Sequence, residues 1–303
     1  MDYILTAESL SKHYGKFKAL DNVSMHIPKG AIYGFVGRNG AGKTTLIRLI
    51  CGLQEPDNGS YTIYGTANDD KGISKQRVRM GAVIETPSIY MEMSAEENLK
   101  QQARILGLPS FDGIDGLLKL IGLEHTGNKK AKHFSLGMRQ RLGIGIALVN
   151  DPDFLVLDEP TNGLDPQGII QIRELILQLN QSRQITLLIS SHILDELSKL
   201  ATHFGFIDNG RIVKEISAEQ LEMMSRQCLR LEVNNIQSLV RVLDTMKLNY
   251  KLINENTAEI YGKPSITPLI QELADQHCEV KSIQEQDESL ESYFINLVGG
   301  THE

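Results

Sequence analysis

The sequence predicts an α/β fold, in which a parallel sheet covered by helices on both faces is followed by a smaller α+β unit. Residues 154–157 (FLVL) and 185–189 (ITLLI) are almost continuously apolar, as is typical of strands buried in a parallel sheet. Upstream, an apolar strand at residues 31–36 is followed by a glycine-rich turn and a helical segment at residues 44–51. After about residue 217 the order of segments is β-α-β-β-α-β, which predicts a ferredoxin-like module.

The N-terminal segments are expected to be short strands and turns, including a strand at residues 60–64 after the turn Asp57-Asn58-Gly59. Ser94 and Glu97 form a capping-box pattern, which predicts a helix to about Gly107. The stretch 88–149 is therefore expected to be mainly helical. A further helix is predicted by apolar residues that share one helical face: Ile169, Ile172, Leu175, Ile176 and Leu179.

The C-terminal module is expected to have strands at residues 229–233, 250–253, 258–261 and 280–283, helices at 236–246 and 266–273, and a last helix at 290–297. We divide the chain into a first domain at 1–217 with a helical subdomain at about 88–150, a linker at 218–227 and an accessory α+β domain at 228–303.

The C-terminal module has no catalytic constellation, and its role stays open between dimer contact, regulation and docking. A cluster of acidic residues is interpreted as a solvated helix start, with a metal site as the alternative: Glu285, Asp287, Glu288 and Glu291.

Composition excludes several classes of protein. With 41% hydrophobic and 23% charged residues, the chain of 303 residues is typical of a globular protein rather than a disordered one. The net charge of −7 offers no basic excess to neutralise phosphates, so we expect no nucleic-acid partner.

The three cysteines, Cys51, Cys228 and Cys278, form no C-x-x-C pair, which favours a location in a reducing cytoplasm. No apolar run approaches the ~18 residues of a membrane span, and the N-terminus is unlike a signal peptide, so action at a membrane would require a partner.

Residues 37–44 match G-x-x-x-x-G-K-[ST], the pattern of the phosphate-binding loop of P-loop NTPases. Glycines let backbone N–H groups approach phosphate oxygens, and the following helix presents its positive end to the anion. Lys43 is expected to reach the β- and γ-phosphates, and the Thr44 hydroxyl to bind Mg²⁺. The strand–loop–helix context argues against a chance glycine-rich turn. The residues predicted to contact the nucleotide are Gly37, Arg38, Asn39, Gly40, Ala41, Gly42, Lys43, Thr44 and Thr45.

Asp158 and Glu159 follow the apolar strand at residues 154–157. Because a buried unpaired charge is costly, carboxylates at the end of such an apolar strand indicate a functional role. Asp158 is predicted to bind the Mg²⁺ shell, and Glu159 to orient the water that attacks the phosphate. A strand that merely runs out into solvent is the alternative.

Residues 134–141 (FSLGMRQR) lie between these two motifs. Here the chain resembles the ATP-binding subunits of ABC transporters, whose signature reads L-S-G-G-Q followed by Q-R. The resemblance covers roughly residues 5–216. It implies that two such subunits, here expected as a homodimer, enclose two ATP molecules and drive a polytopic membrane subunit at the cytoplasmic face of a bacterial membrane. ATP would lie between the phosphate loop of one copy and Ser135 and Gly137 of the other. The resemblance also implies an adenine-stacking ring at Tyr14, an interface residue at Asp165 and a γ-phosphate contact at His192.

Glu85 stands where the family has a glutamine. A carboxylate accepts hydrogen bonds but does not donate them, so Glu85 is expected to favour Mg²⁺ binding. This glutamate and the S-L-G-M-R-Q-R-L signature are similar to a subgroup of exporters that protect bacteria from bacitracin and lantibiotic peptides. The alternatives are a subunit for another substrate or for import, a ribosome-associated ABC protein and a chromosome-maintenance ATPase. A single phosphate loop without a charged linker or sustained heptads argues against the last two.

Overall fold

The computed structural model describes residues 2–224, 227–261 and 264–287. Contacts within the chain divide it into two compact units, residues 1–218 and 219–303. Each unit has a hydrophobic core of its own. The α/β fold expected for the first unit and the α+β fold expected for the second are both confirmed.

A six-stranded sheet forms the centre of the first unit, in the order β10-β9-β3-β8-β7-β6. Its strands are parallel except for β10, which pairs antiparallel with β9. Every residue of β3, β7 and β8 is buried, which explains why their central residues are apolar. The strands are β3 (Ile32–Val36), β6 (Met80–Val83), β7 (Phe154–Asp158), β8 (Thr186–Ser191), β9 (His203–Asp208) and β10 (Arg211–Ser217).

An antiparallel sheet in the order β2-β1-β4-β5 completes the sheets of this unit. Its strands are β1 (Tyr3–Tyr14), β2 (Phe17–Pro28), β4 (Asn58–Ile63) and β5 (Thr66–Ala67). The expectation of short strands was wrong for β1 and β2, which have 12 residues each. Several register shifts interrupt their pairing, and such bulges break the alternation by which a long strand is recognised in a sequence.

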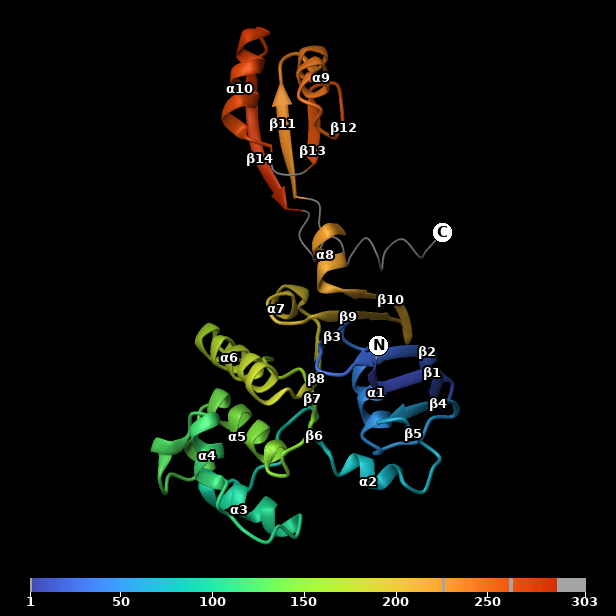
Figure 1. Ribbon diagram of the computed structural model, residues 1–303, viewed down its shortest axis with the longest axis vertical. Coiled ribbons are helices and arrows are strands. Elements are labelled where there is room, and N and C mark those ends of the chain that lie inside the picture. Colours follow the sequence, from blue (N-terminus) through green and yellow to red (C-terminus); the bar gives the residue numbers. More distant parts are fainter. Residues whose placement is uncertain (1, 225–226, 262–263, 288–303) are drawn as a thin grey trace. The chain divides into compact units, whose positions relative to one another are not determined.

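Figure 1 shows α3, α4, α5 and α6 on one side of the parallel sheet, and α1 with the antiparallel sheet on the other. Helix α3 begins with the predicted capping box, in which Ser94 and Glu97 bond reciprocally. The helices are α1 (Lys43–Ile50), α2 (Ile73–Arg77), α3 (Ala95–Ile105), α4 (Ile114–Leu120), α5 (Leu136–Leu148), α6 (Pro166–Arg183) and α7 (Leu194–Ser198), with 3₁₀ turns at Glu124–Thr126 and Ala131–His133.

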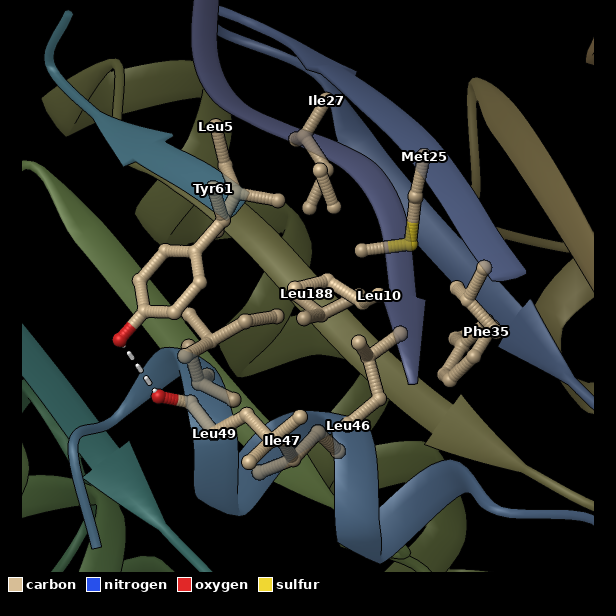
Figure 2. Close-up of a cluster of buried hydrophobic side chains, with 14 of the residues drawn as sticks. Leu5, Leu10, Met25, Ile27, Phe35, Leu46, Ile47, Leu49, Tyr61 and Leu188 are labelled. Carbon is tan, nitrogen blue, oxygen red and sulfur yellow. Dashed lines mark hydrogen bonds between the residues drawn. The ribbon is translucent and has the colours of Figure 1, made fainter. Parts of the chain in front are cut away.

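A cluster of buried hydrophobic side chains lies between α1, the antiparallel sheet and the parallel sheet (Figure 2). Leu46 and Leu49 of α1 and Leu188 of β8 are all fully buried there. Burying a side chain of this size contributes about 1.5–3 kcal/mol. The hydroxyl of buried Tyr61 donates to the backbone oxygen of Leu49 at 2.8 Å, so this buried hydroxyl has a partner. This packing holds the N-terminal end of α1 at the end of β3.

The second unit is a four-stranded antiparallel sheet in the order β12-β13-β11-β14, the ferredoxin-like arrangement. Its elements are β11 (Gln227–Val233), α9 (Ile236–Thr245), β12 (Tyr250–Leu252), β13 (Thr257–Tyr261), α10 (Ile266–Asp275) and β14 (Val280–Asp287). Most of the expected linker forms helix α8 (Ala218–Met224), whose residues are mainly good helix formers. The helix predicted at residues 290–297 lies outside the described residues.

Candidate nucleotide-binding site

The phosphate loop, residues 37–42, connects β3 to α1 and depends on its glycines. Gly40 and Gly42 have φ angles of 83° and 109°, in the left-handed region that favours glycine. A Cβ on Gly37 would lie 2.6 Å from the backbone oxygen of Ile207, so no larger residue fits there. The loop can therefore take a tight course that delivers the free N–H groups of the first turn of α1 to a ligand.

Lys43 curls back over this loop. Its Nζ donates to the backbone oxygens of Gly37 at 2.7 Å and Arg38 at 3.3 Å, and it lies 3.1 Å from Oε1 of Glu159. The side chain is only 6% exposed. Ala41 is a buried residue of the loop, and its N–H donates to the backbone oxygen of Arg38. A buried ammonium group is thus held where the loop would meet a phosphate.

Asp158 lies at the end of β7, paired with Ser190 on the neighbouring β8. Its carboxylate is 1% exposed and accepts hydrogen bonds from the Thr44 hydroxyl at 2.8 Å and the Ser190 hydroxyl at 2.5 Å. Both donors are neutral, so a nearby cation would offset the cost of this buried charge. One carboxylate and one hydroxyl fit Mg²⁺, which is usually bound by few protein groups together with phosphates and water.

Glu159, the next residue, turns out of the strand with a φ of 49°. Its N–H donates to Oγ of Ser190 at 2.8 Å. Its carboxylate lies between two nitrogen groups, Nζ of Lys43 at 3.1 Å and Nδ1 of His192 at 2.9 Å. A carboxylate held from both sides is well placed to orient a water molecule and accept its proton.

These elements surround a cavity of about 280 Å³. The strand β1, the phosphate loop and Glu159 all contribute to its walls. Tyr14 is 43% exposed there, and its hydroxyl donates to Oε1 of Gln54. The lining residues are Tyr14, Phe17, Ala19, Asn39, Gly40, Gly42, Lys43, Thr44, Thr45 and Glu159. The cavity is close to the lower size limit of about 300 Å³ for small-molecule sites.

Three of the predicted residues lie at helix starts and do not line this cavity. Exposed Ser135 caps α5 by accepting from the N–H of Met138 at 3.3 Å, with Gly137 in the first turn. Exposed Asp165 caps α6 by accepting from the N–H of Gly168 at 2.9 Å. Within one chain these residues therefore stabilise helix N-termini.

Glu85 forms an exposed ion pair. Its side chain is 57% exposed, and Oε1 lies 2.5 Å from Nη2 of Arg48, a residue of α1. Its backbone φ is 59°.

Two residues of the site were missed by sequence reasoning. Ser190 bonds both to Asp158 and to the N–H of Glu159, and Phe17 lines the cavity with 61% of its surface exposed. A hydroxyl at the end of an apolar strand beside the acidic strand was a usable signal for Ser190. An aromatic residue directly across the turn from Tyr14 was a signal for Phe17.

The residues 20–162 match the family model described as ABC transporter. The chain is 38% identical to the bacitracin transport ATP-binding protein BcrA of Bacillus licheniformis, over 99% of both chains. It is 44% identical to the lantibiotic transport ATP-binding protein SrtF of Streptococcus pyogenes, over 70% of this chain and 90% of that protein. The solved structure of CbiO1 from Clostridium perfringens, part of an ABC transporter complex, has a TM-score of 0.67 at 28% identity and covers 82% of this chain and 97% of that one.

The chain therefore belongs to the family of ATP-binding subunits of ABC transporters, as its motifs predicted. It is an ATPase of that class. In the described parts of the chain, no helix is both long and apolar enough to cross a lipid bilayer. The same parts contain no group of three His, Cys, Asp or Glu side chains that could hold a metal by itself.

Proposed function

We propose that this chain hydrolyses MgATP to power the export of a peptide antibiotic of the bacitracin or lantibiotic kind through a separate membrane subunit. The observation that carries the ATP site is the hydrogen-bonded network in which Lys43, Glu159 and His192 meet beside the buried Asp158. The substrate class is supported by the names of BcrA and SrtF, and by the match to BcrA over the second unit as well as the first.

In this proposal each side chain has a physical task. The loop N–H groups and Lys43 neutralise the phosphates, and the ring of Tyr14 stacks on adenine. Thr44 and Asp158 hold Mg²⁺, which would supply charge neutralisation at the phosphates. Glu159 orients the attacking water and accepts its proton, while His192 steadies the Glu159 carboxylate and contacts the γ-phosphate. Glu85 pairs with Arg48 through one carboxylate oxygen, and its expected part in Mg²⁺ binding stays a prediction.

A second copy would complete the site. Ser135 and Gly137 lie at the start of α5, where backbone N–H groups favour an anion from another molecule. Asp165 is exposed at the start of α6, where a second copy can contact it. We infer that two copies enclose two ATP molecules and that the pair binds its membrane subunit at the cytoplasmic face of a bacterial membrane.

The ATP site is tested with Lys43→Ala in the purified chain. We expect hydrolysis to fall at least about 100-fold, because the phosphates lose their main charged contact. Lys71→Ala, an exposed lysine before α2, is the matched control and should hydrolyse ATP normally. Normal hydrolysis by Lys43→Ala would contradict the site.

The substrate class is tested in a susceptible bacterial host that expresses this chain with its membrane subunit. We expect higher tolerance of bacitracin or of a lantibiotic, and loss of that tolerance with Lys43→Ala. If the wild-type pair hydrolyses ATP but protects against neither peptide class, the substrate assignment is wrong while the ATPase assignment stands.

A further inference from the structure

A single hydrogen bond joins the segment that follows β7 to the helix that follows β8. The hydroxyl of Thr161 donates to Oε2 of Glu196 at 2.6 Å, across 35 residues of sequence. Thr161 lies two residues after Glu159, and Glu196 lies four residues after His192 on α7. The bond therefore connects the same two segments whose functional contact is the pair Glu159–His192 at 2.9 Å.

The other bonds between these segments lie at the ends of the strands. Ser190 on β8 bonds to Asp158 and to the N–H of Glu159, which fixes the segments only as far as the sheet extends. His192 lies beyond the last residue of β8, with 33% of its side chain exposed. The bond between Thr161 and Glu196 joins the two segments at a point beyond His192 in the sequence.

Glu196 lies on a side of α7 that borders a cavity. The cavity has a volume of about 60 Å³ and lies between α6, β8 and α7, and Thr161 and Glu196 both line it. Leu194 and Leu197 of this five-residue helix are buried, so packing fixes its apolar face. At the cavity the bond between Thr161 and Glu196 adds a directional constraint on where the helix lies.

The backbone of Thr161 also belongs to the turn that leads to Asp165. Its oxygen accepts from the N–H of Leu164 at 3.1 Å, within the turn where Gly163 has a φ of 76°. This turn leads to Asp165, the cap of α6. Anchoring the Thr161 side chain therefore also anchors the turn before Asp165.

We propose that Thr161 and Glu196 are a positioning pair, which sets the distance between Glu159 and His192 and thereby the rate of ATP hydrolysis. This inference rests on the proposed function of Glu159 and His192. It adds two residues that touch neither the cavity of the nucleotide site nor its phosphate loop. Neither contributes charge to the phosphates, so ATP binding should not depend on them.

The first test compares Thr161→Val, which removes the hydroxyl at nearly constant volume, with Thr161→Ser, which retains it. We expect Thr161→Val to lower kcat about tenfold with KM for ATP changed less than about twofold. Thr161→Ser should recover most of the loss. Thr245→Val, in the second unit, controls for a threonine substitution elsewhere. Equal kcat for wild type and Thr161→Val would overturn the inference, as would an equal loss in Thr161→Ser.

The second test asks whether the pair acts through His192. In a chain that already carries His192→Ala, Thr161→Val should lower kcat by less than about twofold, because the distance it controls no longer matters. A full additional loss would show a general structural effect and would overturn the proposal. Lys43→Ala separates the two hypotheses: if it hydrolyses ATP normally, the proposed site itself fails. If Lys43→Ala is inactive and Thr161→Val is normal, only the positioning role fails.

Discussion

The two units of the chain differ in how the ends of neighbouring strands are arranged. In the first unit β7 and β8 are parallel, so their polar ends, Asp158 and Ser190, lie side by side and bond to each other. In the second unit strands that are adjacent in the sheet are antiparallel, so their carboxyl ends lie at opposite edges of the sheet. A parallel sheet gathers the residues that follow its strands at one edge, and the proposed nucleotide site of the first unit lies there.

The largest effect that would sharpen this comparison is expected from Asp158→Asn. The amide would turn N–H donors toward one of two hydroxyl donors and would remove the buried charge that suits Mg²⁺. We expect kcat for ATP hydrolysis to fall at least about 100-fold. A matched change in the second unit, Asp244→Asn, should leave the rate within about twofold. Steady-state hydrolysis of both purified variants gives the answer, and similar rates would contradict the division of roles.

A large effect on stability alone is expected from Leu231→Ala. Leu231 is fully buried in the core of the second unit, and the cavity left by its truncation should cost about 2–5 kcal/mol of unfolding free energy. Leu252→Ala is the control, because that leucine lies in the same cross-strand row but is 48% exposed. Hydrogen exchange resolved by segment should show the loosening in the second unit. Equal loosening at the phosphate loop would break the comparison.

A moderate effect is expected from Ser190→Ala. The change leaves the N–H of Glu159 without its acceptor and removes one donor from Asp158. A buried polar group left unsatisfied costs about 1–3 kcal/mol, so we expect kcat to fall about tenfold. Ser198→Ala, whose hydroxyl bonds locally on α7, serves as the control. Unchanged kcat in Ser190→Ala would show that the strand-end network does not position Glu159.

The smallest effect is expected from the exposed pair Arg48–Glu85. A double-mutant cycle with Arg48→Ala and Glu85→Ala should give a coupling free energy below about 1 kcal/mol, because solvent screens both charges. Chemical denaturation of the four chains measures it. A coupling well above that value would indicate that Glu85 has a structural role that its exposure does not suggest.

The residues proposed for the nucleotide site of the first unit could be located in the sequence because they belong to local patterns. Lys43, Thr44, Asp158 and Glu159 each follow a strand or open a helix, and that placement is visible in a few consecutive residues. Contacts across the fold were not predictable in this way. The bond of Ser190 to Asp158 and the pairing of Glu85 with Arg48 join residues 32 and 37 positions apart.

Some elements were missed for physical reasons. Strand β9 contains Gly205, a residue that usually indicates a turn, yet it is needed there because the ring of Tyr33 lies against it. Helices α2 and α7 have five residues each, too few for a helical period to appear. The second unit was predicted more completely, since its alternating strands and amphipathic helices have regular periods, but no motif predicted its task.

Glu159 is proposed to activate the water that attacks ATP, and Glu159→Gln removes this ability while changing little else. Glutamine retains an oxygen that Lys43 can donate to, but it does not accept a proton from water. We predict that the purified variant binds ATP as the wild type does and hydrolyses it at least about 100-fold more slowly. Glu174→Gln, an exposed glutamate on α6, should remain active. Hydrolysis by Glu159→Gln within about threefold of the wild-type rate would contradict the account.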